Sequence, residues 1–216
     1  MKKNTPFPSA ENLEQYFSAR KIAYSFSNKE VALKQLYAPY KNCMECPLSK
    51  QGRSQVVFGE GNPNATIMFV GEGPGRDEDA QGRPFIGRAG QLLNKIIEAM
   101  NMKREDVYIS NVVKCRPPQN RTPLPNESQT CSSILLFREI EIIKPKVICT
   151  LGVTAAQRII SETIRMSNIR GNFHKGNQSL VMPTYHPAYL LRNPEAKKIV
   201  WEDMKKILSF FKEQKS

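Results

Sequence analysis

A glycine-rich stretch with carboxylates and one aromatic ring is the part of this sequence best suited to chemistry. It runs from Gly71 to Gly87 as GEGPGRDEDAQGRPFIG and carries Glu72, Glu78 and Phe85. It follows a short apolar run and precedes a periodic helical segment, so we expect a loop at the carboxyl end of a buried strand, where α/β sheets bind ligands. The alternative is a tight strand-to-helix connection with a solvated acidic cap.

Polar residues also follow three further apolar runs. Asn111 ends one run, Gly152 and Thr154 follow the next, and His186 follows the last. If these strands are parallel, right-handed crossovers place all their carboxyl ends at one edge of the sheet, so an acidic loop, an amide, a helix N-terminus and an imidazole converge there. The second histidine, His174, is expected in a hairpin or a loop that contacts nucleic acid, not in catalysis.

The cysteines are the second group with chemical potential. Cys43 and Cys46 form a C-x-x-C pair, and Cys115 and Cys131 flank a proline-rich loop. Two such pairs can enclose one tetrahedral metal ion or one iron–sulfur cluster, and the spacing alone leaves zinc open. Cys149 lies within an apolar run and is interpreted as a small buried hydrophobe.

Strands and helices alternate from Cys43 onward, which predicts an α/β fold with helices on both faces of a sheet. The strands are expected at 54–58, 66–71, 106–112, 146–151 and 179–184, and the helices at 88–100, 127–143, 154–160 and 194–212. Residues 41–216 are expected to form this domain. Residues 1–40 are interpreted as an N-terminal helical extension, with helices at 10–24 and 29–40 and a helix cap at Ser27 or Asn28.

The charge favours a polyanionic partner, because 32 Lys and Arg against 20 Asp and Glu give a formal net charge of +12 over 216 residues. No apolar run suits a membrane crossing or a secretory signal, so we expect a cytoplasmic protein associated with the nucleoid. Arg76 stands where a dinucleotide-binding G-x-G-x-x-G would need its third glycine, and the phosphate-loop and G-x-S-x-G motifs are absent from the sequence.

Four motifs in this order resemble the iron–sulfur uracil-DNA glycosylases, the family-four or type-a branch of that superfamily. They are GEGPG from Gly71, GRPFIG from Gly82, NVVKCRPP from Asn111 and HPAYLLR from His186. The resemblance covers about residues 43–211. It implies a three-layer α/β/α fold around a four-stranded parallel sheet, removal of uracil from DNA by base flipping, and a [4Fe–4S] cluster held by Cys43, Cys46, Cys115 and Cys131.

The resemblance also implies roles for residues of the glycine-rich loop and the sheet edge. Phe85 would stack on uracil, and the amide of Asn111 would pair with its polar edge. His186 would stabilise negative charge that develops on uracil. The backbone of Glu72 and Gly73, with the carboxylate of Glu72 or Glu78, would place the attacking water. Other branches carry an aspartate or asparagine where Gly73 stands.

DNA contacts are implied for the basic and apolar side chains around these motifs. Leu190, with Leu191 beside it, resembles the wedge that fills the gap left by a flipped base. The candidate phosphate contacts are Arg192, Arg83, Lys114, Arg116 and Arg170, of which two or three are expected to be solvated surface charges instead. The loop 117–123 lacks the histidine with which some related proteins bond covalently to the abasic site, so we expect ordinary turnover.

Two other functions remain open from the sequence. One is a non-catalytic iron–sulfur module that binds nucleic acid in replication or repair. The other is a metabolic α/β enzyme that uses the glycine-rich loop for a phosphorylated small molecule, which the absent phosphate motifs disfavour. We expect a monomer that binds uracil-containing DNA and no membrane, with residues 1–40 available to a protein partner.

Overall fold

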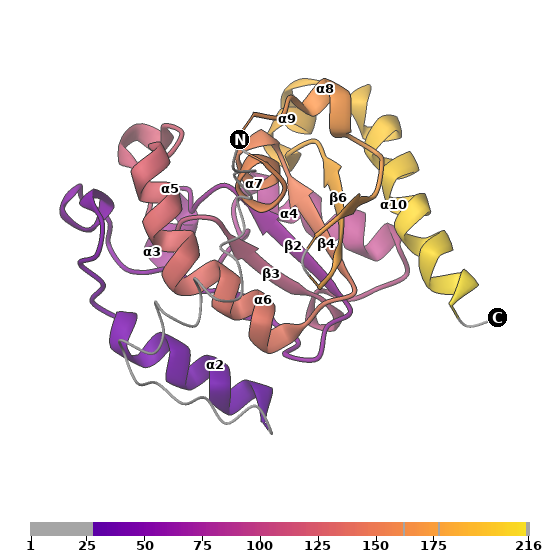
Figure 1. The fold of residues 1–216 in the computed structure, drawn as a ribbon. Helices are drawn as coiled ribbons and strands as arrows, with labels where there is room; N and C mark the ends of the chain where they lie inside the picture. The colour runs from indigo at the N-terminus through magenta and orange to yellow at the C-terminus, as the bar shows by residue number, and fades with distance from the viewer. Residues whose placement is uncertain (1–27, 162, 177, 215–216) are drawn as a thin grey trace, which may run out of the picture.

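A computed structural model describes residues 28–161, 163–176 and 178–214. Its centre is a six-stranded sheet in the order β1-β3-β2-β4-β6-β5 with helices on both faces (Figure 1). The four middle strands are parallel, and they are β2 (Ile67–Gly71), β3 (Tyr108–Asn111), β4 (Val147–Leu151) and β6 (Leu180–Thr184). The predicted α/β class and four-stranded parallel centre are therefore confirmed.

The sheet has two edge strands beyond the four predicted. Each is two residues long and antiparallel to its neighbour: β1 (Glu60–Gly61) pairs with β3, and β5 (His174–Lys175) pairs with β6. The strand predicted at 54–58 is wrong. The backbone N–H of Ser54 donates to both carboxylate oxygens of Asp79 at 2.9 Å, so this segment is hydrogen-bonded to the short helix α3 (Arg76–Gln81) after β2 instead of to a neighbouring strand.

Two helical layers enclose the sheet, and β2 shows how one strand serves both. Met68 and Val70 belong to one core cluster, whereas Ile67 and Phe69 belong to the other. The first layer contains α2 (Lys29–Tyr37), α5 (Pro125–Cys131), the π-helical η5 (Ser132–Leu136), α6 (Phe137–Ile143) and α7 (Val153–Ile159). The second contains α4 (Arg88–Ala99) and α10 (Ala196–Glu213) (Figure 1).

The long helices were predicted to within about two residues at most ends, although the helix expected at 127–143 begins at Pro125 and includes the π-helical turn. Three short helices near the loops were not predicted: α3 (Arg76–Gln81), α8 (Met166–Ile169) and α9 (Pro187–Arg192). Such helices span two turns at most, too little for a 3.6-residue period to show. The remaining short turns are 3₁₀ helices: η1 (Ala38–Tyr40), η2 (Pro47–Lys50), η3 (Arg104–Asp106) and η4 (Pro118–Asn120).

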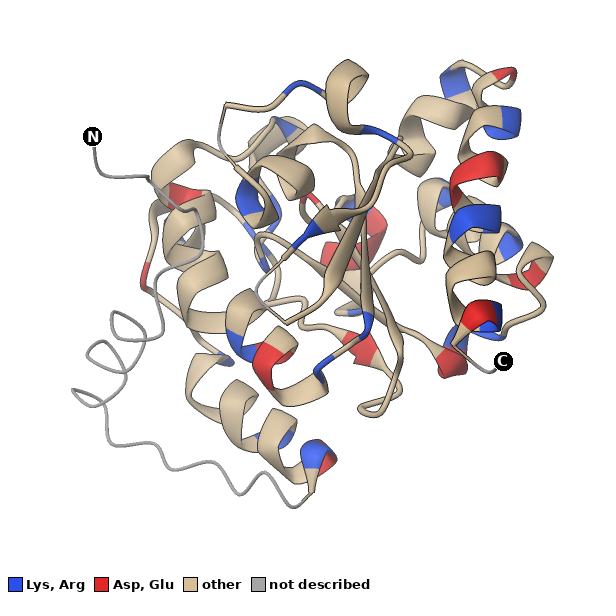
Figure 2. Ribbon diagram, turned by 45° about the vertical axis from the view of Figure 1, so that its right-hand side comes forward, with Lys and Arg blue, Asp and Glu red and all other residues tan. Residues whose placement is uncertain are grey.

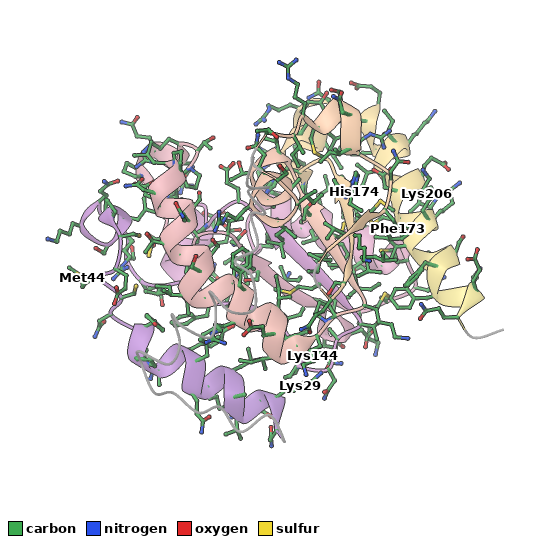
Figure 3. All side chains as sticks on the ribbon, in the orientation of Figure 1. Lys29, Met44, Lys144, Phe173, His174 and Lys206 are labelled. Atoms are coloured by element: carbon green, nitrogen blue, oxygen red, sulfur yellow. The ribbon has the colours of Figure 1, made fainter. Side chains whose placement is uncertain are left out.

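The described part of the N-terminal segment packs into the domain. The predicted cap is Asn28, whose side chain accepts hydrogen bonds from the backbone of Glu30 and Val31. Three residues of α2, Ala32, Leu33 and Leu36, are buried in the same core cluster as one face of the sheet. Lys29 donates to the carbonyl of Ile143 at the end of α6, where Figure 3 shows it beside Lys144. The helix predicted at 10–24 lies outside the described residues.

No helix among the described residues combines the length and the apolar character needed to cross a membrane.

Candidate active site

A cavity of about 930 Å³ opens at the carboxyl edge of the parallel strands. Its lining includes residues that follow β2, end β3, follow β4 and follow β6, so the predicted convergence at one edge is confirmed. Eight of the residues predicted to act on DNA line it: Glu72, Gly73, Glu78, Phe85, Asn111, Arg116, His186 and Arg192.

A glycine at the end of β2 brings two of these side chains together. A Cβ atom on Gly71 would lie 2.4 Å from Cζ of Phe85 and 2.5 Å from Oδ1 of Asn111, so any larger residue would push both away. Phe85 itself has φ +52°, an uncommon conformation for a large side chain. The site therefore depends on a close approach that only glycine permits and on a loop held in a strained shape.

The loop around Phe85 is held by hydrogen bonds from its own backbone. Oε1 of Glu78 accepts from the N–H groups of Ile86 and Gly87 at 2.9 Å, and Oε2 accepts from Gly75 at 3.1 Å. On the other side, the guanidinium of Arg104 donates to the carbonyl of Phe85 at 3.1 Å. Oε1 of Glu78 thus holds the loop that carries the aromatic ring, whereas Oε2 caps the N-terminus of the helix that contains Glu78.

Asn111 lines the cavity and carries an unsatisfied acceptor. The residue is 2% exposed, and its Oδ1 is one of two buried side-chain polar atoms in the described residues that have no hydrogen-bond partner. The other, Oγ1 of Thr150, belongs to a residue that does not line the cavity. A buried unpaired acceptor costs about 1–3 kcal/mol, so a ligand that donates a hydrogen bond to Asn111 would recover that cost.

His186 is a neutral donor. Burial and the nearby cation of Arg192 lower the pKa of His186 to about 4, against the opposing effect of Glu78. Nδ1 accepts a hydrogen bond of 3.1 Å from the backbone of Ala188, which places the proton of the neutral ring on Nε2. The ring lies 5.6 Å from that of Phe85, centroid to centroid, so an N–H donor stands beside the aromatic face.

Glu72 is a carboxylate of the cavity lining that, in the described part of the chain, accepts no hydrogen bond from the backbone of the loop. Its side chain accepts a hydrogen bond from the hydroxyl of Thr154, the residue near the start of α7 that was expected at this edge. Its carbonyl accepts from the backbone N–H of Val113 at 3.1 Å, which fixes the main chain. Unlike Glu78, Glu72 is not committed to backbone N–H groups within the loop.

The prediction that Leu190 fills the gap left by a flipped base does not agree with the position of this side chain. Leu190 is 1% exposed and packs in the core cluster that contains α4, because the turn of α9 directs it inward. Its neighbours Tyr189 and Leu191 are 39% and 37% exposed, and Tyr189 lines the cavity. The ring of Tyr189 lies 4.9 Å from that of Tyr185.

The predicted phosphate contacts divide into three groups. The prediction for Lys114 is wrong, because this side chain is fully buried. Arg83 and Arg170 are paired with Glu60 and Asp203, respectively. Arg116 and Arg192 line the cavity, as do three arginines that were not predicted: Arg76, Arg88 and Arg121. Basic residues also occur on other parts of the described chain, including α10, where acidic residues are interspersed with them (Figure 2).

His174 does not line this cavity. It lies in a hairpin, which was one of the two locations predicted from the sequence. It belongs to β5, which pairs with β6, and its Nε2 lies 3.0 Å from the carbonyl oxygen of Ile169. Figure 3 shows it next to Phe173 on the side of the sheet near α10.

The four predicted metal ligands line a second, small cavity. They are Cys43, Cys46, Cys115 and Cys131, whereas Cys149 is buried in β4. Met44, between the first pair, is exposed on the outside of the molecule (Figure 3).

The surroundings of these cysteines favour bound thiolates. Arg53 donates to Sγ of Cys115 at 2.9 Å, and the backbone N–H of Lys114 donates to Sγ of Cys131 at 3.2 Å. Burial raises the pKa of Cys115 to about 11, so a cation is needed to keep that thiol ionised at neutral pH. No three metal-ligating side chains in the described residues meet as they would around a single ion. The four cysteine sulfurs nevertheless line one cavity, and thiolates are the donors that hold iron–sulfur clusters.

Comparison with known proteins places the chain in a family. The model of the uracil DNA glycosylase superfamily matches residues 58–205, which include the cavity residues from all four parallel strands. The chain belongs to the uracil-DNA glycosylase superfamily. The resemblance that the four motifs indicated is therefore confirmed.

Individual relatives agree with this assignment. A type-4 uracil-DNA glycosylase of Thermotoga maritima is 49% identical, over 81% of this chain and 92% of the relative. That of Sulfurisphaera tokodaii is 47% identical, over 77% of this chain and 79% of the relative. A DNA polymerase of Bacillus phage SP01 is 27% identical over 77% of this chain, but the match covers 19% of the polymerase.

Proposed function

We propose that this uracil-DNA glycosylase flips uracil out of DNA into the 930 Å³ cavity and hydrolyses its N-glycosidic bond, leaving an abasic site. The enzyme class follows from the family and from the type-4 relatives. The observation that carries the site assignment is the buried, unpaired Oδ1 of Asn111 beside Phe85 and His186.

Asn111 distinguishes uracil from cytosine in this proposal. Uracil has an N3–H donor and an O4 acceptor, which match the oxygen and the NH₂ group of the amide. Cytosine has an unprotonated N3 and an amino group, so it would leave the buried Oδ1 unpaired and bring two donors together. A buried hydrogen-bonding site of this kind rejects a mismatched ligand strongly, because its polar groups lose water without gaining partners.

Asn111→Ala tests this assignment. It should lower the rate of uracil release by about ten- to a hundredfold, since one buried hydrogen-bonding group contributes about 1–3 kcal/mol. Affinity for uracil-containing DNA, measured by fluorescence anisotropy at fixed salt, should change much less, because the phosphate contacts remain. Equal losses in rate and in affinity would mean that Asn111 is a DNA-binding residue and not the reader of the base.

His186 then stabilises the leaving group. Cleavage is expected to be dissociative, with an oxocarbenium-like sugar and a uracil anion. The neutral ring with its proton on Nε2 donates a hydrogen bond to the uracil oxygen on which charge develops. Phe85 stacks on the departing base, and its ring is fixed before the substrate arrives by Glu78, Arg104 and the contact at Gly71.

Glu72 is the proposed group that places the attacking water, with the backbone at Gly73. Glu72→Gln should lower kcat by about a hundredfold or more with little change in thermal stability, as expected for loss of a general base. Glu78→Gln is the matched variant. The carboxylate of Glu78 accepts three backbone hydrogen bonds, so Glu78→Gln should lower the melting temperature. The rate of uracil release by this variant should fall because Phe85 is displaced. A larger loss of kcat in a fully folded Glu78→Gln would reverse this assignment.

Tyr189 replaces Leu190 as the proposed contact with the opened duplex. Stacking of a base on an aromatic side chain contributes about 1–3 kcal/mol, so Tyr189→Ala should slow release from duplex DNA by about tenfold. Release from single-stranded DNA should be affected less, because no gap in a base stack must be filled. Tyr189→Phe keeps the ring and should retain the rate on the duplex. Full activity of Tyr189→Ala on the duplex would leave Leu191 as the exposed candidate.

A [4Fe–4S] cluster is proposed at the second cavity, held by Cys43, Cys46, Cys115 and Cys131. Bound there it would act as a cross-link between the segment before β1 and the two ends of the proline-rich loop, since hydrolysis requires no redox step. The hydrogen bonds from Arg53 and from the backbone of Lys114 support sulfurs that carry negative charge.

The phage polymerase match favours one second candidate, a non-catalytic module attached to replication proteins. Such a module would bind DNA and leave uracil in place. Alkali treatment of a uracil-containing oligonucleotide after incubation with the protein distinguishes the two, because only abasic sites break.

A further inference from the structure

A fully buried lysine lies between the cysteine cavity and the proposed uracil site. Lys114 is 0% exposed, and its Nζ donates to Oγ of Ser110, to the carbonyl of Asn111 at 2.8 Å and to Oε2 of Glu139 at 2.8 Å. All three of its acceptors are buried. Burying an ion pair in this way is costly, and it contributes little net stability compared with a well-packed apolar pair.

The main chain of Lys114 belongs to the cysteine cavity. Its N–H donates to Sγ of Cys131 at 3.2 Å, and the next residue is Cys115. The side chain then returns toward the end of β3, where it reaches the carbonyl of Asn111. One residue therefore connects two proposed cluster ligands to the residue proposed to read the base.

The hydrogen bond from Lys114 to the carbonyl of Asn111 matters because, among the residues that the structure describes, no hydrogen bond holds Oδ1 of the Asn111 side chain. Oδ1 has no hydrogen-bond partner in the described residues, so close packing around Gly71, where Phe85 also lies, and the position of the backbone hold the amide in place. The residues just after it are fixed to the loop of Glu72: Val112 donates to the carbonyl of Gly71 at 2.9 Å, and Val113 donates to the carbonyl of Glu72 at 3.1 Å. The bond from Lys114 fixes the peptide group of Asn111 itself.

We infer that Lys114 is a positioning residue for uracil recognition, which holds the Asn111 amide in register with the base and ties that register to the cysteine cavity. The inference rests on the proposed role of Asn111. Lys114 does not contact the substrate in this account, because it does not line the large cavity.

The test changes the ion pair without leaving a buried charge unpaired. In Lys114→Met/Glu139→Gln, the glutamine oxygen can still accept from the hydroxyl of Tyr37 at the place of Oε1, and its NH₂ group can donate to Ser110 in place of the lysine. The carbonyl of Asn111 loses its donor, and the hydroxyl of Ser110, which donates to Oε2 of Glu139, loses its acceptor. Tyr37→Phe is the matched control, because it removes a hydrogen bond on the far side of Glu139 and leaves Lys114 intact.

Rates are compared between full-length proteins with equal iron content and with melting temperatures above the assay temperature. Lys114→Met/Glu139→Gln should lower kcat for uracil release at least tenfold and change KM for the DNA less than about twofold. In an Asn111→Ala background the same pair of changes should lower kcat less than twofold, because the side chain that it positions is already gone. Tyr37→Phe should retain the kcat of the wild type.

Two results overturn the inference: an unchanged kcat in Lys114→Met/Glu139→Gln, or an equal loss in the presence and absence of the Asn111 side chain. If the double variant does not fold or does not hold iron, Ser110→Ala decides, since it removes one acceptor of Lys114 and leaves the ion pair. It should lower kcat about two- to fivefold, and only while Asn111 is present; no loss of kcat, or the same loss without Asn111, contradicts the inference. A wild-type protein that releases no uracil would instead overturn the proposed function.

Discussion

Replacing His186 by alanine should lower the rate of uracil release about 100- to 1,000-fold, the usual effect of removing one preorganised donor from a developing anion. The expectation follows from the tautomer, because the backbone of Ala188 occupies Nδ1 and leaves the N–H of Nε2 for the leaving group. DNA affinity should stay within a few fold of the wild type. Single-turnover rates and anisotropy on the same oligonucleotide measure the two quantities.

The pH dependence provides a control on the same residue. Its pKa lies near 4 in the folded protein and near 6.5 in the unfolded chain, so the ring stays neutral from pH 8 down to about pH 5. The wild-type rate should therefore show no loss attributable to His186 near pH 6.5. Between about pH 6.5 and 4 the unfolded state takes up the proton first, so this residue lowers the free energy of unfolding as the pH falls through that window. A rate that requires a protonated group with pKa near 6.5 would contradict the neutral-donor role.

Replacing Cys131 by serine should produce the second large effect, on folding and metal content. Cys131 is the last residue of α5 and directly precedes the π-helical turn. Its sulfur accepts a hydrogen bond from the backbone N–H of Lys114. Loss of a metal ligand is among the changes that reach about 4 kcal/mol. At this chain length that corresponds to a melting temperature lower by roughly 8–16 °C. Iron content and visible absorbance should fall together.

Cys149→Ala is the matched control, because Cys149 is also buried but lies within β4 outside the cysteine cavity. It should keep the iron content of the wild type and lose only the stability expected for a small cavity. Iron retained at wild-type levels in Cys131→Ser, or zinc in place of iron in the wild type, would contradict the proposed cluster.

The parallel strands could be predicted because each is a short apolar run that ends at polar or glycine residues. Ile67 to Val70 is one such run, and Gly71 follows it in register with Asn111 of β3. The crossover rule then brought Asn111, His186 and Thr154 to one edge without knowledge of any side-chain position. The edge strands β1 and β5 have two residues each, too few for a pattern.

The orientation of single side chains was beyond the sequence. Leu190 and Lys114 were both expected to face DNA, yet Leu190 turns into the core and Lys114 pairs with Glu139. In both cases a partner distant in sequence decides the orientation: the core cluster of α4 for one and a carboxylate on α6 for the other. The commitment of Glu78 to the backbone of Ile86 and Gly87 was equally invisible, because a helix, α3, had to form first.

Uracil release from a defined oligonucleotide tests the proposed function most directly. Iron-loaded wild-type protein is incubated with a duplex that contains one uracil opposite guanine, and the strand is then treated with alkali. A uracil-DNA glycosylase should produce a break at the uracil and none in the matched duplex that carries cytosine at that position. A strand left intact, under conditions in which an unrelated uracil-DNA glycosylase produces the break, would contradict the proposed function.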